Sequence, residues 1–205
     1  MNTQNLLPLA MKVKRINMLS VKPLHPKDVL QMTNWGKHED LRLLHYNFNY
    51  ISAYDCQRWY RSKNKLLRKY IFGIYTEDIL VGYITLKNIN WLFRKAEMGI
   101  VLNPSEVNKG YGTQAIRKYL RIVFDHYKMK RIILRVAAFN KRAKRAYEKV
   151  GFSVYKESYE VYEEQEFLLK ENNYTLFDEM IYKKGEIYTK YYYMFYNKPN
   201  DIQEI

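Results

Sequence analysis

The chain has one cysteine, Cys56, among 205 residues, so it cannot form an internal disulfide. No activating pattern surrounds Cys56, and we expect a small buried hydrophobic side chain there instead of a nucleophile. No run of about 18 apolar residues occurs, which argues against a helix across a membrane. The apolar stretch near the N-terminus carries its charges on the wrong side for a signal peptide. We therefore expect a cytoplasmic protein with no membrane partner.

Motifs for metal binding and for hydrolysis are missing as well. The four histidines, His25, His38, His45 and His126, have no metal-ligand spacing and no partner cysteine. Neither G-x-S-x-G nor H-E-x-x-H occurs in the sequence. We therefore expect no metal site, and the sequence disfavours a serine hydrolase or a zinc enzyme.

Acidic residues are scarce, with 21 of them against 35 lysines and arginines, which gives a net charge of +14. The excess is local, because the segment from Lys109 to Lys149 has thirteen basic residues and two acidic ones, and only +3 is left for the rest of the chain. A basic face spread over a domain favours a nucleic-acid partner. An excess of positive charge that is concentrated in one segment favours a single bound anion, so we do not expect a nucleic acid as the partner. Binding to RNA or to the ribosome stays a second hypothesis.

What the sequence does contain is enough for one α/β domain. Apolar residues make up 47% of the chain and can form a sizeable core. Residue patterns predict strands at 15–24, 70–75, 79–87, 95–102, 131–138, 152–159 and 187–196. They predict helices that begin at Pro26 and that cover 53–66, 110–127 and 140–149. We expect a mixed sheet in a domain at 15–197, with an N-terminal extension at 1–14, an insertion near 160–184 and a polar tail at 198–205.

Two glycines, Gly110 and Gly112, stand just before the predicted helix at 110–127, in the stretch "VNKGYGTQA". The unpaired amides of a first helical turn and the helix dipole favour a bound anion. Glycine lets the backbone approach that anion without a Cβ in the way. The pattern therefore indicates a phosphate site, and a turn that serves only chain reversal is the alternative.

Two well-known phosphate motifs fit this turn poorly. A P-loop needs a lysine and then a serine or threonine after its last glycine, and Gly112 is followed by Thr113 and Gln114. The spacing of Gly110, Gly112 and Ala115 does satisfy a G-x-G-x-x-A dinucleotide pattern. However, that pattern should follow a strand directly and be followed by an acidic residue about 20 positions on, and neither feature is present.

The segment 97–152 resembles the GCN5-related N-acetyltransferase family, in particular the branch of ribosomal-protein alanine and spermidine N-acetyltransferases. "AEMGIVLNPSEVNKGYGTQAI" is similar to the family's pyrophosphate loop, R/Q-x-x-G-x-G/A, and "AAFNKRAKRAYEKVGF" to its later signature. One departure is Val107, at the position of the family's Arg or Gln. The resemblance implies an acetyl-CoA-dependent N-acetyltransferase without a metal, on a mostly antiparallel twisted sheet with a splayed central strand pair.

By this resemblance, the strand at 95–102 binds the pantetheine arm and the turn after it binds the pyrophosphate. The implied cofactor-binding residues are Ile100, Val101, Leu102, Asn108, Lys109, Gly110, Tyr111, Gly112, Thr113, Asn140 and Lys144. Tyr147 is implied as the acid that protonates the departing thiolate, and Glu97 as a base that acts directly or through water. The alternatives are a core tyrosine at 147 and a surface ion pair at Glu97.

The acceptor amine should bind near the aromatic segment at 46–48 and the insertion. That insertion is rich in acidic side chains, namely Glu160, Glu163, Glu164, Glu166, Glu171, Asp178 and Glu179. An acidic wall suits a cationic amine, such as a polyamine, an aminoglycoside or a protein N-terminus, although the acids can equally form a solvated face. An amino-sugar nucleotide is a further acceptor that the sequence leaves open, and so is assembly as a homodimer.

Overall fold

The computed structural model describes residues 19–65, 68–163 and 165–199. The predicted extension at 1–14, the start of the first strand, Leu66, Glu164 and the end of the polar tail lie outside these residues. The strands are β1 (Leu19–Pro23), β2 (Lys69–Thr76), β3 (Ile79–Asn90), β4 (Lys95–Leu102), β5 (Arg131–Ala137), β6 (Ser153–Val161), β7 (Met180–Lys183) and β8 (Glu186–Asn197). The α-helices are α1 (Ala53–Lys63), α2 (Tyr111–Asp125), α3 (Lys141–Val150) and α4 (Glu166–Leu169), and the 3₁₀ helices are η1 (Pro26–Asn34), η2 (Leu41–Tyr46), η3 (Pro104–Glu106) and η4 (Lys170–Leu176).

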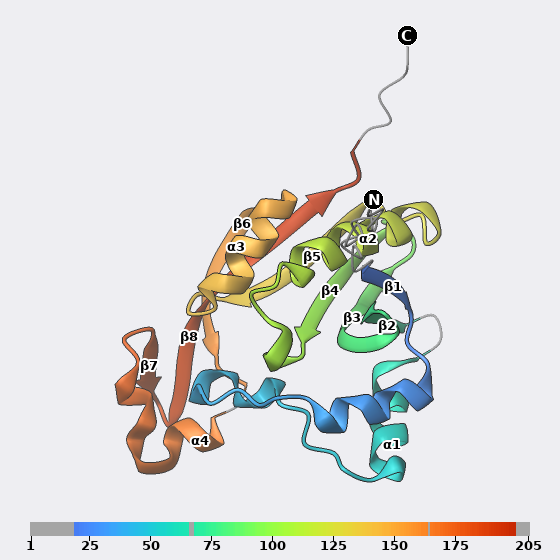
Figure 1. Ribbon diagram of the computed structural model, residues 1–205. Helices are drawn as coiled ribbons and strands as arrows, with labels where there is room; N and C mark the ends of the chain where they lie inside the picture. Colours follow the sequence, from blue (N-terminus) through green and yellow to red (C-terminus); the bar gives the residue numbers. More distant parts are fainter. Residues whose placement is uncertain (1–18, 66–67, 164, 200–205) are drawn as a thin grey trace, which may run out of the picture.

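The strands form one mixed sheet in the order β1-β2-β3-β4-β5-β8-β6, and β7 pairs with β8 beside it. Every pair is antiparallel except β4 with β5. Helices flank this sheet (Figure 1). The predicted fold class, an α/β domain with a mixed and mostly antiparallel sheet, is confirmed.

The pairing of β4 with β5 stops early. Only Lys95, Ala96 and Glu97 have partners in β5. Beyond them, β4 stays paired with β3 as far as Leu102, while β5 stays paired with β8 as far as Ala137. The two central strands therefore separate in the middle of the sheet, which is the splay that the resemblance implied.

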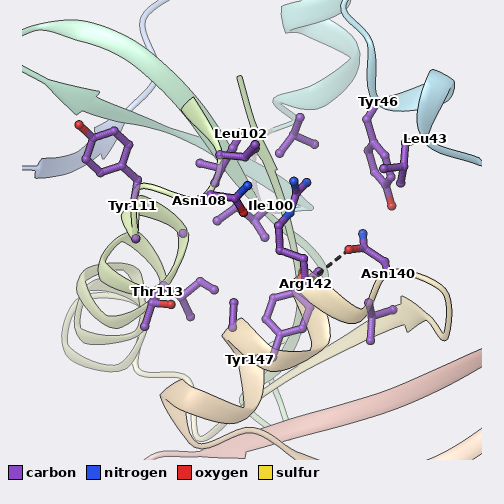
Figure 2. Close-up of a pocket in the computed structure, with 18 of the residues that line it drawn as sticks. Leu43, Tyr46, Ile100, Leu102, Asn108, Tyr111, Thr113, Asn140, Arg142 and Tyr147 are labelled. Atoms are coloured by element: carbon purple, nitrogen blue, oxygen red, sulfur yellow. Dashed lines mark hydrogen bonds between the residues drawn. The ribbon is translucent and has the colours of Figure 1, made fainter. Parts of the chain in front are cut away.

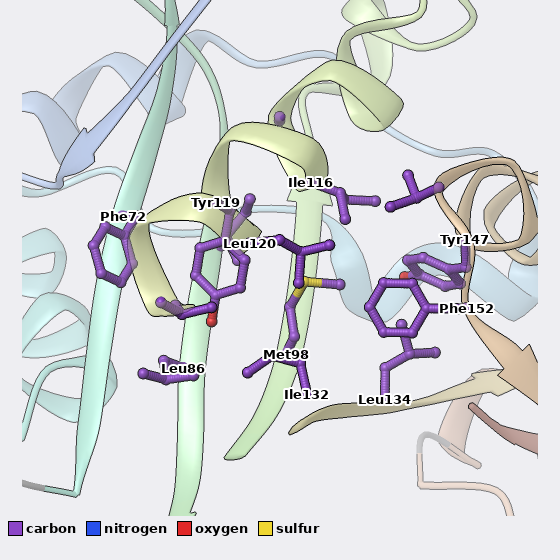
Figure 3. Packing of buried hydrophobic residues seen from close by; sticks show 14 of the residues in the cluster. Phe72, Leu86, Met98, Ile116, Tyr119, Leu120, Ile132, Leu134, Tyr147 and Phe152 are labelled. Carbon is purple, nitrogen blue, oxygen red and sulfur yellow. The ribbon is translucent and has the colours of Figure 1, made fainter. Parts of the chain in front are cut away.

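Helices cover both faces of the sheet. Neighbouring residues of β2 show this, because Phe72 packs in one core cluster with α2 and α3 while Ile71 packs in another with η1 and α1. On α2 the buried face includes Ile116, Tyr119 and Leu120, which lie over β2, β3 and β4 (Figure 3). The single cysteine is buried in the second cluster, as expected.

The segment predicted as a loose insertion is more regular than expected. It contains α4, η4 and β7, and it packs in a third cluster on the far part of β8 (Figure 1). The sequence analysis missed β7. Its signal is the pair Lys184 and Gly185, whose positive φ angles of 53° and 83° close a tight turn into β8. The helix predicted from Pro26 is a 3₁₀ helix, because its hydrogen bonds, such as Trp35 N–H to the Met32 carbonyl, span three residues.

The buried Tyr119 hydroxyl offers a test of the core. Among the described residues it has no hydrogen-bond partner, and an unpaired buried hydroxyl costs about 1–3 kcal/mol. Tyr119→Phe should therefore raise the free energy of unfolding by about 1 kcal/mol. The matched change Tyr162→Phe removes a hydroxyl that donates to the Arg42 carbonyl at 2.6 Å, so it should lower stability. Urea titrations measure both, and a destabilised Tyr119→Phe protein would mean that bound water satisfies this hydroxyl.

Candidate active site

A cavity of about 300 Å³ lies where β4 separates from β5. It is lined by the end of β4, the turn before α2 and the start of that helix, β5, and the first two turns of α3. A few side chains from the opposite face, including Leu43 and Tyr46, complete the lining (Figure 2). The residues predicted from the sequence that line it are Ile100, Val101, Leu102, Asn108, Gly110, Tyr111, Gly112, Thr113, Asn140 and Tyr147. Lys109, Lys144 and Glu97 do not line it.

The turn before α2 presents free backbone amides to the cavity. Asn108 and Gly110 have positive φ angles of 65° and 79°, and Gly110 caps the helix without a side chain. The first helical hydrogen bond of α2 joins the Gln114 N–H to the Gly110 carbonyl at 3.3 Å. The N–H groups of the preceding residues of the first turn therefore have no helical partner and stay available. A Cβ at Gly112 would stand 3.4 Å from Leu102 Cδ1, an ordinary contact. A small side chain would fit there, and the glycine leaves the amides of the first turn accessible to an anion.

The end of β4 also offers backbone groups. Asn103 N–H donates to the Val81 carbonyl of β3 at 2.9 Å. Backbone groups in an antiparallel ladder alternate between the two edges of a strand. The backbone N–H and C=O of Val101 therefore face β3. The backbone N–H and C=O groups of Ile100 and Leu102 face the opposite edge of β4, where β5 is no longer paired. A ligand with amide groups can pair with that edge.

Helix α3 carries two predicted residues into the cavity. The side-chain oxygen of Asn140 accepts from Ala143 N–H at 3.1 Å and caps the helix, which leaves its NH₂ group for a ligand. Tyr147 lies two turns further on, is only 7% exposed and packs beside Phe152 (Figure 3). Burial, with a smaller contribution from Tyr46, raises the pKa of the Tyr147 phenol above its ordinary value of about 10. The phenol is therefore protonated at neutral pH and can act as an acid.

The cations of the cavity are arginines. Arg142, in the first turn of α3, reaches its centre near Asn108 and Ile100 (Figure 2). Arg135 of β5 also lines the cavity, but it is paired with Glu160 at 2.9 Å and with Glu163. Both arginines belong to the basic segment at 109–149, and no motif singled out Arg135.

The lysines predicted to bind the cofactor point elsewhere. Lys109 Nζ lies 2.8 Å from Glu106 Oε2. Lys144 pairs with Glu148 one turn on, and its Nζ lies 4.9 Å from the centre of the Tyr192 ring. Arg142 is thus better placed than either lysine to meet an anion in this cavity.

Glu97 lies at the paired end of β4, away from the lining. Its Oε1 is 3.0 Å from Lys87 Nζ, and its Oε2 accepts from Asn88 Nδ2 at 2.7 Å. Glu97 therefore binds two side chains of β3, and the ion pair that the sequence analysis gave as the alternative is present, with Lys87 as the partner. Its role as a base stays a prediction.

The described acidic side chains of the insertion do not form a wall around the cavity. Glu160 and Glu163 are bound to Arg135, and Glu179 Oε2 lies 3.4 Å from Arg42 Nη1. Within the part of the chain that the structure describes, no carboxylate lines the cavity. The same residues contain no group of histidine, cysteine or acidic side chains that could hold a metal. None of the described helices has the length and apolarity to cross a bilayer.

Several lining residues were not predicted from the sequence, and three of them carry side chains that could contact a ligand. Arg135 is one, and His38 and Leu43 are the others. The latter two come from the segment around η2, which has no motif. The structure places His38 there through Asn47, whose side chain bonds to both the N–H and the carbonyl of His38.

Comparisons with known proteins agree with this geometry. Residues 19–153 match the model of the acetyltransferase (GNAT) domain family. Spermidine N(1)-acetyltransferase of Vibrio cholerae is 31% identical over 126 residues, which cover 55% of this chain and 73% of that protein. The putative ribosomal N-acetyltransferase YdaF of Bacillus subtilis is 30% identical over 80 residues, 39% of this chain and 44% of that protein. The crystal structure of a Vibrio cholerae spermidine N-acetyltransferase in complex with CoA and spermine has a similar fold, with a TM-score of 0.64, 21% identity and coverage of 87% of this chain and 95% of that one.

The arginine of the cavity gives a direct test of the anion site. Arg142→Gln should weaken the binding of CoA roughly tenfold and reduce its dependence on salt, because a charge-assisted contact to phosphate is lost. Lys144→Gln, two residues along α3, should change the affinity little, since Lys144 is paired with Glu148. Calorimetry at two ionic strengths separates the variants. Equal losses in both would show that the general field of the basic segment, and not Arg142, attracts the ligand.

Proposed function

Because the chain belongs to the GNAT family of acetyl-CoA-dependent N-acetyltransferases, we propose that its cavity moves the acetyl group to the primary amine of a small molecule. The observation that carries this proposal is the separation of β4 from β5 beyond Glu97. It leaves a strand edge free in the sheet, with the free amides of α2 beside it and Tyr147 in the same cavity. These are the parts that a thioester on a long phosphate-bearing arm requires.

The arrangement of these groups implies one orientation for bound acetyl-CoA. Its pyrophosphate suits the first-turn amides of α2, with Arg142 as the counter-charge. Its pantetheine arm carries amide groups that can pair with the backbone of Ile100 and Leu102, as a strand would. The thioester then lies near Tyr147. The amine attacks the carbonyl carbon, the C–S bond breaks, and the phenol supplies a proton to the leaving sulfur.

The residues on the acceptor side of the cavity suit an amine attached to a small apolar group. Leu43 and Tyr46 reach the cavity from the face opposite α2 and α3. A primary amine attached to a short carbon chain or ring could pack there, whereas a polyamine with several charges would find no carboxylate in the described lining. A cytoplasmic setting suits a chain whose one cysteine is a buried thiol. Assembly as a homodimer stays a prediction.

Gly112 tests the binding of the donor. Gly112→Trp should fill the space in front of the α2 amides and weaken acetyl-CoA binding at least about 100-fold. Gly112→Ala should stay within about tenfold of the parent, because its Cβ would make an ordinary contact with Leu102. Calorimetry gives both affinities, and circular dichroism shows whether each variant is folded. A folded Gly112→Trp protein with unchanged affinity would contradict the proposed donor site.

Tyr147 tests the chemistry. Tyr147→Phe keeps the ring and its packing on Phe152 and removes only the proton donor. Turnover should fall about 100-fold while acetyl-CoA affinity stays unchanged. Because the raised pKa keeps the phenol protonated, ionisation of Tyr147 should cause no loss of parent activity below about pH 10. Tyr54→Phe, at an exposed position of α1, is the control. Turnover of Tyr147→Phe close to that of the control would assign the proton to water or to another group.

A further inference from the structure

A primary amine is an ammonium ion at neutral pH. It must lose a proton, which frees the lone pair of its nitrogen, before it can attack the thioester. The cavity is therefore expected to hold a proton acceptor. Among the described lining residues, the titratable side chains are His38, Arg135, Arg142 and three tyrosines. Arginine stays protonated in proteins, and a phenol that carries its own proton cannot accept a second one. The imidazole of His38 is the group that can accept one.

The structure holds His38 in place through its backbone and leaves its ring available. Its N–H donates to Asn47 Oδ1 at 2.7 Å, and its carbonyl accepts from Asn47 Nδ2 at 3.1 Å. The ring lies edge-on to Tyr46, with centroids 6.4 Å apart. Among the described residues, no group hydrogen-bonds to the His38 ring. By contrast, His25 Nδ1 accepts from Lys27 N–H, and His45 Nδ1 lies 3.0 Å from the Tyr162 hydroxyl.

We propose that His38 is the general base of the reaction, working from the acceptor face of the cavity opposite the acid Tyr147. This inference rests on the proposed function. The acceptor ammonium gives one proton to His38, which passes it to solvent, and the free amine attacks the carbonyl. When the C–S bond breaks, the sulfur takes the phenolic proton of Tyr147, and the second proton lost by the nitrogen restores the phenol. The products are the amide and CoA thiol, with one proton released.

The charges that face His38 suit this role. Burial and Arg142 lower the pKa of His38, and Asp40 opposes them only in part. Asp40 is itself held by Arg42, with contacts of 3.0 and 2.8 Å. His45 is neutral as well, because burial lowers its pKa to about 4. Tyr46 and Arg135, the latter paired with two glutamates, complete the surroundings. The imidazole is therefore neutral and ready to accept a proton at pH 7.

The position of Arg142 also links the base to the donor. A phosphate bound against Arg142 would screen its charge, and the repulsion that lowers the pKa of His38 would weaken. His38 would then become a stronger base once acetyl-CoA is bound. Donor binding would thus prepare the acceptor side before the amine is deprotonated, through one shared guanidinium and without any movement of the backbone.

The sign of the expected pH dependence follows from the lowered pKa. The competent form of His38 is the neutral one, which is present above its folded pKa and lost as the pH falls through it. The kcat/KM for the acceptor should therefore show an acid limb centred below the ordinary histidine value of about 6.5 and a plateau above it. His45, with a pKa of about 4, cannot produce that limb.

The test compares His38→Gln with His126→Gln, whose histidine is exposed at the end of α2. Thiol release from saturating acetyl-CoA is measured across a panel of primary amines, and then with the best amine from about pH 5 to about pH 9. His38→Gln should lower kcat/KM at pH 7 about 100-fold and replace the plateau by a continuous rise, as only free amine reacts. CoA affinity should be unchanged. His38→Ala should be partly rescued by added imidazole.

A second readout does not depend on turnover. Proton NMR titration of the histidine rings, with the His38 signal assigned by its loss in His38→Gln, should give a pKa that rises when CoA binds. The pKa should also rise in Arg142→Gln. A His38→Gln enzyme that keeps the acid limb and most of its activity would overturn the inference while leaving the proposed function standing. A parent protein that releases thiol with none of the amines would overturn both.

Discussion

Beyond Glu97 the backbone of β4 has lost its partner on one side, and the rest of the site is arranged around that edge. Buried amides and carbonyls need partners, so a strand edge that opens inside a sheet is stable only where solvent or a ligand can reach it. Here it opens onto a cavity. The hydrogen bonds of β3 hold the other edge of β4 as far as Leu102, so the open edge is rigid. A ligand arm with its own amides can therefore bind as an added strand.

The two faces of the sheet contribute different chemistry to this opening. From one face, α2 brings free amides and α3 brings Arg142 and Tyr147, which suit a phosphate-bearing donor and its leaving group. From the other face, the segment around η2 brings His38 and Tyr46, which suit an acceptor. The two contributions meet in the cavity where β4 separates from β5. Arg142 lines this cavity and lowers the pKa of His38, so in the proposed reaction one charge would act on both the donor and the acceptor.

Local signals predicted much of the donor side from the sequence. The Gly110 turn, the helix that starts near Asn140 and the β4 boundaries are set by residues close to one another in the chain, and all three agree with the structure. Distant side-chain partners, such as Arg135 and Glu160, are set by the tertiary fold, and sequence patterns do not predict them. The pairs of Lys109 with Glu106 and of Lys144 with Glu148 are local, and the prediction of two lysine contacts to the cofactor overlooked them. His38 enters the cavity from a segment without a motif.

The central claim is that the open edge of β4 binds the donor arm, and residue-resolved amide hydrogen exchange tests it most directly. The ladder alternates, so the amides of Ile100 and Leu102 should exchange more slowly when acetyl-CoA is added, whereas that of Val101, which faces β3, should change little. The amides of Tyr111, Gly112 and Thr113 should also become protected. Equal protection of all three β4 amides, or protection confined to other parts of the chain, would contradict the account.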